Sequence, residues 1–255
     1  MLYYTVRVIP LGGIGGWVSN PLLGNVSLMV ETGKSRILID AGEGTYRALR
    51  TCGFDVDNLD LILITHRHGD HVMGLSTLAL FAKAKGIMLR VYGPRDVDLQ
   101  KLFDALGIPQ YLSAIEFHPI DPSPEPLTVI IGHDYRITAV LADHTIPTLA
   151  YRIDGSDGSC VTYSSDTRPT SNIVNLARDC TLLIHEASGN PGTEEVSHLH
   201  GHSTTSEALQ IAREAGVKYL MPVHYYVESP ILSGAHGVNI VIPLPCTPLD
   251  TQRLK

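Results

Sequence analysis

The sequence predicts an α/β fold, because apolar segments of strand length alternate along the chain with longer segments of helical periodicity. The chain has 255 residues, of which 44% are hydrophobic and 18% are charged. These are ordinary values for a globular protein, and the length is sufficient for a large buried core. We therefore expect one domain over residues 1–255. Residues 243–255, which contain Pro243, Pro245 and Pro248, are expected to form a tail, either disordered or packed against a partner.

Strands are expected where short apolar runs are bounded by polar or turn-forming residues. In the first half of the chain they are 5–10, 26–31, 36–40, 61–65, 88–92 and 114–118. In the second half they are 127–131, 136–142, 148–153, 160–164, 182–185, 219–223 and 237–242. The proline-rich segment 121–126 links the two halves and is interpreted as lying inside the domain.

Helices are expected at 44–51, 74–85, 94–106, 171–177 and 205–215. The last is the best defined, because Thr204 and Glu207 form a capping-box pattern and Gly216 follows its end. Its apolar residues have helical spacing, which places them in the core rather than in a site. These residues are Ala208, Leu209, Ile211, Ala212 and Ala215.

Charge and cysteine usage exclude some functional classes. The formal net charge of −7 argues against a surface that coats nucleic acid in general. No C-x-x-C pair is present, so the cysteines indicate neither a zinc ribbon nor a disulfide framework, and a reducing cytoplasm is the expected location. The cysteines are Cys52, Cys160, Cys180 and Cys246. No signal-peptide pattern and no apolar run near the roughly 18 residues of a membrane span occurs, so no membrane association is expected.

The segment Thr65-His66-Arg67-His68-Gly69-Asp70-His71 directly follows the apolar run 61–64. Open α/β sheets place their ligand sites at such strand ends. Imidazole nitrogen and carboxylate oxygen are ligands that Zn²⁺ takes in proteins. Four potential ligands so close in sequence could hardly all bind one tetrahedral ion, so this segment indicates a site for two metal ions.

Three further candidate ligands follow other apolar runs. His144 comes after 137–141, Asp166 after 160–162 and His224 after 219–220. Each falls where a strand is expected to end, which is the position that a strand-end site requires. A single histidine is more often structural than metal-binding. The interpretation as a metal site therefore depends on all the candidate ligands occurring together, each after an apolar run.

The histidine-rich segment resembles the T-H-x-H-x-D-H signature of the metallo-β-lactamase superfamily. Four further segments resemble motifs of ribonuclease Z and its relatives: 40–45 (DAGEGT), 165–169 (SDTRP, with serine in place of glycine), 183–188 (LIHEAS) and 201–204 (GHST). Asp166, where class B β-lactamases have cysteine, and His68, where flavodiiron proteins have an acidic residue, favour this branch. The resemblance covers roughly residues 5 to 226 and implies an αβ/βα four-layer sandwich.

The resemblance also implies a ligand set and catalytic roles. The first ion, Zn²⁺ or alternatively Mn²⁺ or Fe²⁺, is assigned to His66, His68 and His144, the second ion to Asp70, His71 and His224, and Asp166 bridges both. Asp70 is expected to orient the nucleophile, and His202 to stabilise or protonate the leaving oxygen. Glu186 is expected either to orient His202 or a metal-binding histidine, or only to satisfy the hydrogen bonds of a loop.

Other features are expected to contribute less. The glycine-rich segment 12–16 is interpreted as a flexible loop beside the cleft, and His198 and His200 as members of an exposed loop in which only His202 is engaged. Trp17 and Tyr46 could stack on a base or an aryl group, although most aromatic side chains simply pack in the interior.

One departure from the family concerns the substrate. Ribonuclease Z proteins typically insert a long arm that grips tRNA between the residues matching His144 and Asp166, and here only 21 residues separate the two. The sequence therefore predicts a metal-dependent phosphodiesterase. Its leading candidate substrate is the 3′ side of precursor tRNA, followed closely by a small or cyclic phosphodiester, and without the arm tRNA cleavage is expected to be slow unless a homodimer partner or a basic loop replaces it. Two alternatives stay open: a hydrolase of another ester (aryl sulfate, thioester or lactone), and a non-catalytic metal-binding module.

Overall fold

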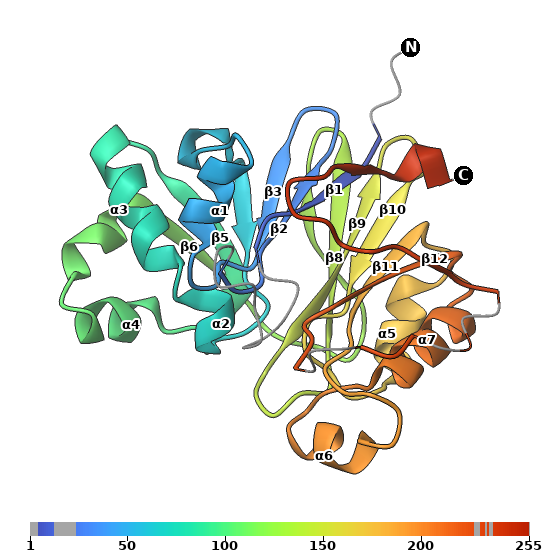
Figure 1. Ribbon diagram of the computed structural model, residues 1–255. Coiled ribbons are helices and arrows are strands. Elements are labelled where there is room, and N and C mark those ends of the chain that lie inside the picture. The colour runs from blue at the N-terminus through green and yellow to red at the C-terminus, as the bar shows by residue number, and fades with distance from the viewer. Residues whose placement is uncertain (1–4, 13–23, 227–229, 233, 235–236, 255) are drawn as a thin grey trace.

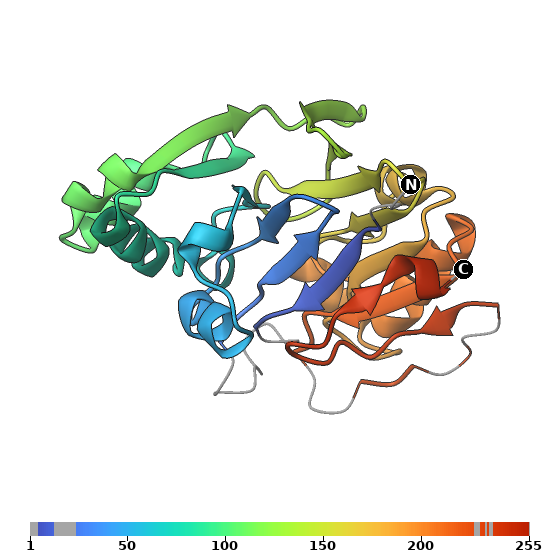
Figure 2. The same cartoon turned by 90° about the horizontal axis from the view of Figure 1, so that it is seen from above.

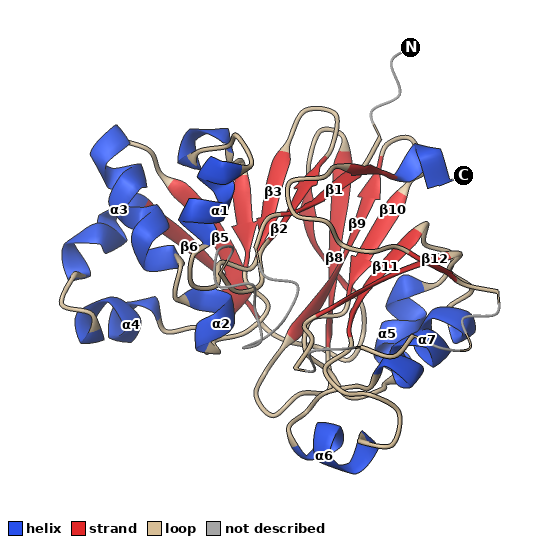
Figure 3. Cartoon of the chain, viewed as in Figure 1, coloured by secondary structure: helices blue, strands red, loops and turns tan. Residues whose placement is uncertain are grey.

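The computed structural model describes residues 5–12, 24–226, 230–232, 234 and 237–254. Two β-sheets pack face to face in the middle of the molecule, and helices lie on the outer side of each (Figure 1 and Figure 3). Seen from above in Figure 2, the blue strands of the first sheet lie between the cyan helices and the second sheet. This arrangement confirms the predicted αβ/βα sandwich.

The first sheet, as far as the chain is described, has seven strands in the order β14-β1-β2-β3-β4-β5-β6. Its strands are β1 (Arg7–Pro10), β2 (Leu28–Glu31), β3 (Arg36–Ile39), β4 (Leu61–Leu63), β5 (Leu89–Pro94), β6 (Ile115–Ile120) and β14 (Leu249–Asp250). Strands β3 to β6 run parallel, while β14, β1, β2 and β3 pair antiparallel. The connecting helices are α1 (Thr45–Thr51), η1 (Val56–Asn58), α2 (Gly69–Val72), α3 (Leu75–Lys85), α4 (Leu99–Ala105) and η2 (Pro109–Ala114).

The second sheet repeats this pattern, with seven strands among the described residues in the order β13-β12-β11-β10-β9-β8-β7. Its strands are β7 (Leu127–Ile131), β8 (Tyr135–Leu141), β9 (Leu149–Gly155), β10 (Cys160–Tyr163), β11 (Leu182–Glu186), β12 (Tyr219–Val223) and β13 (Asn239–Ile240). Strands β10 to β13 run parallel, and β7 to β10 pair antiparallel. The helices of this half are α5 (Ser171–Ala177), α6 (Glu194–Leu199), α7 (Thr205–Glu214) and η3 (Thr251–Leu254).

Strand residues alternate between two buried environments, which explains the continuous apolar runs of the central strands. In β4, Leu63 packs between the sheets whereas Ile62 packs against the helices of the first half. In β11, Ile184 packs between the sheets whereas Leu183 packs against the helices of the second half. Strands buried on both faces need apolar residues at every position. The core between the sheets draws on residues from both halves of the chain.

Helix α7 begins and ends where its sequence signals predicted. The Glu207 carboxylate accepts a hydrogen bond from the Thr204 backbone N–H at 2.8 Å, and the Thr204 hydroxyl accepts one from the Glu207 N–H at 3.4 Å. Gly216 follows the helix with a φ of +71°, a conformation that glycine adopts without the steric cost of a Cβ atom. The predicted start and stop signals of this helix are confirmed.

The predicted helix over 94–106 was too long at its start. Pro94 is the last residue of β5, where it is paired with Ile120, so the chain is still extended at that point. Helix α4 begins only at Leu99, because the Asp98 side chain accepts a hydrogen bond from the Lys101 N–H at 3.0 Å and caps the helix there.

The expectation of no disulfide framework is contradicted by the structure. Cys52 pairs with Cys246, their Cα atoms 4.9 Å apart, and Cys160 pairs with Cys180 at 5.1 Å. The partners are 194 and 20 residues apart, so local spacing gave no sign of either pair. The prediction of a reducing cytoplasm depended in part on unpaired cysteines and loses that support.

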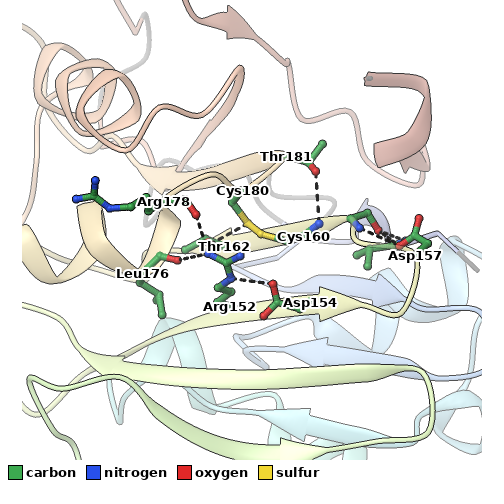
Figure 4. Close-up of a disulfide and its surroundings, with 11 residues drawn as sticks. Arg152, Asp154, Asp157, Cys160, Thr162, Leu176, Arg178, Cys180 and Thr181 are labelled. Carbon is green, nitrogen blue, oxygen red and sulfur yellow. Dashed lines mark hydrogen bonds and ion pairs between the residues drawn. A yellow bond between two sulfur atoms is a disulfide. The ribbon is translucent and has the colours of Figure 1, made fainter.

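Figure 4 shows the surroundings of the second disulfide, which joins the start of β10 to the segment before β11. The Arg152 guanidinium donates hydrogen bonds to the backbone carbonyls of Leu176 and Arg178 at 3.0 and 2.9 Å. Both contacts fix the end of α5 to strand β9. The disulfide and the hydrogen bonds of Arg152 therefore connect the same part of the second half.

The C-terminal segment is not a tail. Strand β14 pairs with β1, and the buried Thr251 hydroxyl donates a hydrogen bond to the Val6 carbonyl at 2.7 Å. Cys246 ties the same segment to the helix side of the first sheet. The prolines that suggested a tail lie in the connection before this edge strand. Within the described residues, no helix has the length and apolar character needed to cross a membrane.

Candidate metal centre

The predicted metal ligands converge at the C-terminal ends of strands of both sheets. Among the described residues, three overlapping groups form, with the ligand atoms inside each group within 4.8 Å of one another. Two of them hold the predicted ligands: His66, His68, His144 and Asp166 in the first, and Asp70, His71 and His224 in the second. The third joins His202 to Asp166 and His224. All seven predicted ligands are thus brought together by loops that follow β4, β8, β10 and β12.

The first group is built around short distances between imidazole nitrogens. His68 Nδ1 lies 3.0 Å from His66 Nε2 and 3.2 Å from His144 Nε2. Such distances leave three nitrogen atoms facing one point, which is the arrangement that three histidine ligands of one metal ion present.

Asp166 lies between the two groups and is almost completely buried. Its Oδ2 atom is 3.6 Å from His66 Nε2 and 3.4 Å from His71 Nε2, and its Oδ1 atom is 3.4 Å from His224 Nε2. Oδ1 accepts no hydrogen bond from any described residue. A buried carboxylate oxygen without a donor costs free energy unless a cation compensates it, so this atom fits a metal site.

The Asp40 carboxylate orients two of the histidines from outside the centre. It accepts hydrogen bonds from the Thr65 N–H at 2.8 Å, the Thr65 hydroxyl at 2.9 Å and His71 Nδ1 at 2.8 Å. The Thr65 hydroxyl in turn accepts from His66 Nδ1 at 3.0 Å. With their Nδ1 protons engaged, both histidines present Nε2 lone pairs to the centre.

Two more histidines are oriented in the same way from the second half. His144 Nδ1 donates to the Gly201 carbonyl at 2.8 Å, and His224 Nδ1 lies 3.2 Å from the Ser188 hydroxyl oxygen. Gly201 has a φ of +81°, and a Cβ atom there would lie 2.5 Å from His144 Nδ1. The close approach of this backbone to the imidazole explains why glycine occupies the position.

The surroundings of the three histidines in the first group lower their pKa values and so favour the neutral imidazole. Burial, together with the neighbouring His71, lowers the pKa of His66 well below its usual value. Burial is also the main cause that lowers the pKa of His68 and of His144. A metal ion binds imidazole only through an unprotonated nitrogen, so these directions favour ligation.

The second group and Asp166 form a network of opposite charges. Burial acts against the charged form of His71, but Asp166 and Asp40 outweigh it and raise its pKa well above the usual value. Burial likewise opposes ionisation of Asp166, but His224 and His71 lower its pKa well below the usual range. The pKa of Asp70 is lowered to about 2 against the effect of burial, first by its hydrogen bond with His224. Both aspartates are therefore ionised at neutral pH.

Glu186 is a fully buried carboxylate that joins His202 to the surrounding loops. Its Oε1 atom accepts from His202 Nδ1 at 3.0 Å, the Thr167 N–H at 3.1 Å and the Ser203 N–H at 2.9 Å. Its Oε2 atom accepts from the Ser188 N–H at 3.0 Å and from the Ser188 hydroxyl at 2.9 Å. Glu186 therefore acts through His202 and Ser188 and is a positioning residue.

His202 lies against the metal-ligand groups. Its ring centroid is 5.1 Å from that of His144 and 5.3 Å from that of His224. Burial opposes its charged form, but the hydrogen bond to Glu186 and the charge of that carboxylate raise the pKa of His202 above its usual value. His202 is thus held next to the centre with Nδ1 engaged and Nε2 available.

The sequence interpretation was wrong about His198 and did not assign roles to Asp40, Ser188 or Tyr226. His198 belongs to α6, and its Nε2 atom lies 2.6 Å from a Glu207 oxygen, so it is engaged rather than part of an exposed loop. Asp40 and Ser188 fall inside motifs that the resemblance had marked, which was the signal available for them.

Two further features follow from aromatic packing. The Tyr226 ring contacts both His202 and His224 at centroid distances of 5.2 and 5.1 Å, and nothing in the sequence predicted this. Tyr46 stacks on Phe81 at 3.8 Å and so packs inside the first half. Trp17 and most of the glycine-rich segment lie outside the described residues.

Comparison with known proteins agrees with this geometry. Residues 35–225 match the β-lactamase superfamily domain. The Ribonuclease Z of Methanopyrus kandleri is 32% identical, over 83% of this chain and 84% of its own length. That of Archaeoglobus fulgidus is 28% identical, over 89% and 91%.

This chain belongs to the ribonuclease Z branch of the β-lactamase superfamily. The human short-form tRNase Z structure shares its fold, with a TM-score of 0.80 at 20% identity over 95% of this chain and 98% of that one.

The connection between His144 and Asp166 has 21 residues. The structure fills it with β9, a turn at 156–159 and β10, which pair as an antiparallel hairpin. This confirms that the arm expected of the branch is absent at this position.

Three of the loops around the centre, those after β3, β10 and β12, share a backbone feature. Asp40, Ser165 and His224 have φ values of +57°, +56° and +60°, in the left-handed region. The ribonuclease Z motif has glycine where this chain has Ser165, which is the residue type that this conformation favours. The Ser165 hydroxyl is buried and forms no hydrogen bond with a described residue.

We expect Ser165→Gly to raise the free energy of unfolding by about 1 kcal/mol. A residue with a Cβ atom pays roughly 1–2 kcal/mol to adopt the left-handed conformation, and glycine does not pay this steric cost. The gain outweighs the additional conformational entropy that glycine gives to the unfolded chain. Urea unfolding monitored by circular dichroism measures the change.

Ser164→Gly is the matched control and should instead destabilise the protein. The Ser164 hydroxyl donates to the Ser165 carbonyl at 2.7 Å and accepts from the Glu186 N–H at 3.0 Å. Equal effects of the two substitutions would contradict the assignment of strain to position 165.

Proposed function

We propose that this chain is a metal-dependent phosphodiesterase of the ribonuclease Z type whose preferred substrate is a small phosphodiester rather than precursor tRNA. The observation that carries the proposal is the convergence of three ligands on each side of one buried carboxylate, Asp166. Membership of the ribonuclease Z branch supports a phosphodiester over another ester.

The proposed cofactors are two Zn²⁺ ions, with Mn²⁺ or Fe²⁺ as alternatives. Oxygen and imidazole donors suit all three metals. The first ion is assigned to His66, His68 and His144, the second to Asp70, His71 and His224, and Asp166 to both. When bound, two such ions supply Lewis acidity that activates water at neutral pH and offsets the charge of the transition state.

Asp70 is the proposed orienting group for the nucleophile. Its Oδ2 atom lies 3.3 Å from His224 Nε2. Its side chain is 25% exposed to solvent, compared with 2% for the side chain of Asp166. An ionised carboxylate that still reaches solvent can accept a hydrogen bond from the attacking water and fix its direction.

His202 is the proposed proton donor to the leaving oxygen. Glu186 engages Nδ1 and favours the protonated ring, so the proton available for transfer is on Nε2. General acid catalysis requires a group held at a fixed position with a proton to give, and Glu186 provides both conditions.

The choice of a small substrate follows from what the chain lacks for binding tRNA. Contacts remote from the scissile bond make a large substrate competitive, and the arm that would provide them is absent. A formal net charge of −7 also weakens long-range attraction to a polyanion. A homodimer that replaces the arm stays a prediction.

Metal content should show two ions per chain. We expect wild-type protein saturated with zinc and then dialysed to retain about two ions, and Asp166→Ala to retain fewer than one, because one substitution removes a ligand from both sites. Asp143→Ala is the matched control, since that carboxylate pairs with Arg168 outside the two groups, and it should retain two ions. Two ions in Asp166→Ala, measured by plasma mass spectrometry, would contradict the shared ligand.

His202→Ala should keep its zinc but lower turnover of a diester with a poor leaving group by roughly 10²–10⁴, the usual contribution of a general acid. A nitrophenyl diester should lose much less, because nitrophenolate leaves without protonation. An equal loss on both substrates would show that His202 does not act on the leaving oxygen.

Parallel assays test the proposed function itself. Zinc-loaded protein should hydrolyse bis(p-nitrophenyl) phosphate readily and leave an aryl sulfate and a thioester intact, while cleavage of precursor tRNA should be slow and binding of tRNA only shallowly dependent on salt. Preferred hydrolysis of the sulfate or thioester would assign a different ester, and tight, steeply salt-dependent tRNA binding would restore tRNA processing as the main function.

A further inference from the structure

A cavity of about 680 Å³ opens directly beside the candidate metal centre. His68 and His202 form its inner wall, and the residues of α6, the loop after β11 and Tyr226 form the rest. Figure 1 shows α6 standing off from the two sheets on the side where the loops of the centre gather. The volume falls within the roughly 300–1,000 Å³ of small-molecule sites.

The helix that forms the outer wall is held firmly in place. His198 on α6 is hydrogen-bonded to Glu207 of the capping box, and the Arg168 guanidinium donates to the His198 carbonyl at 2.6 Å. A Cβ atom at Gly189 would overlap the Ser197 hydroxyl, so α6 packs directly on the loop after β11. The cavity is therefore formed in advance of any ligand.

The lining of the cavity offers no formal charge apart from what its histidines carry. Of the described residues that line it, none is lysine, arginine, aspartate or glutamate. Val196 faces it while 62% exposed, which places apolar surface at the rim. The Thr193 hydroxyl is already donated to the Asn190 carbonyl at 2.8 Å.

On the α6 side of the cavity, away from His68 and His202, the lining selects against a charged occupant. A charged group that enters a cavity loses hydration, and only paired charges or several hydrogen bonds offset that loss. A nucleic-acid strand also needs lysine or arginine along its path. The exposed Glu195 on the same helix adds negative charge outside the cavity, which disfavours a second phosphate there.

The position of His202 shows which part of a diester the cavity would receive. His202 lines this cavity and lies beside the leaving oxygen in the proposed function, so the group attached to that oxygen lies on the His202 side. Tyr226, whose ring contacts His202, and His200 offer flat surfaces on the same side. Aromatic surfaces of this kind favour a planar partner.

We propose that this cavity binds the leaving group of the substrate, and that this group is small, uncharged and planar, such as an aryl or nucleoside-base moiety. The inference rests on the proposed function and adds the chemical class of the substrate to it. Specificity is thus set by α6, outside the metal-binding residues.

The test compares two diesters, methyl phenyl phosphate and methyl m-carboxyphenyl phosphate. Both have the same phosphodiester group and the same aromatic ring, and only the second carries a carboxylate on the leaving ring. Release of each phenol is followed by chromatography with the zinc-loaded protein. We expect kcat/KM to favour the uncharged ring by at least about tenfold, since the carboxylate must give up hydration on the α6 side of the cavity, where no lysine or arginine replaces it.

Charge substitutions on α6 locate the effect. Val196→Lys should shift the preference at least about tenfold toward the carboxylated ring, because it supplies the missing counter-charge, and Val196→Asp should strengthen the preference for the neutral ring. Leu199→Lys is the matched control: Leu199 is 73% exposed on the same helix and does not line the cavity, so the preference should stay within about twofold of wild type.

The outcomes separate the two proposals. If wild type hydrolyses both diesters without preference, or if Leu199→Lys shifts the preference as much as Val196→Lys, the cavity does not bind the leaving group although the proposed function stands. If neither diester is hydrolysed, the proposed function fails, and the inference fails with it.

Discussion

The buried carboxylate of Asp40 is the interaction on which the centre depends most. It accepts from the Thr65 N–H, the Thr65 hydroxyl and His71 Nδ1 at 2.8 to 2.9 Å, and so joins the ends of β3 and β4 to the helix that follows. Through Thr65 it also orients His66. Without this carboxylate, two histidines would lose the hydrogen bonds that fix their rings, and a ligand set must be held in place before a metal ion can bind strongly.

Glu186 has the corresponding position in the second half of the chain. It joins Ser188, which contacts His224, to His202 and to the loop that carries Asp166. The two sheets repeat one pattern of antiparallel and parallel strands, so the carboxyl ends of parallel strands from both halves face the same region. Each half therefore contributes a buried carboxylate that arranges its own loops around the shared Asp166.

Substrate selection is separate from this common centre. The hairpin of β9 and β10 leaves no arm for tRNA, while α6 forms one wall of a small cavity beside His202 that contains no lysine or arginine. The proposed metal ligands would act on the phosphate that all diesters share, so they do not explain a preference among diesters. The residues that can do so lie on α6, which is a short helix fixed by His198 and Glu207 and free to differ at positions such as Val196.

The sequence by itself predicted every described strand except β14, the ends of α7 and the residues that the structure brings together in the candidate metal centre, but it did not predict α6. These depend on side-chain type and on neighbours a few residues away, as with Thr204 and Glu207. Only the tertiary structure decided the Cys52–Cys246 pair, the edge strand β14, the hydrogen bond of His198 and the cavity under α6. Each of these joins segments whose proximity is set by how the sheets and helices pack, and local sequence patterns carry no record of such long-range contacts.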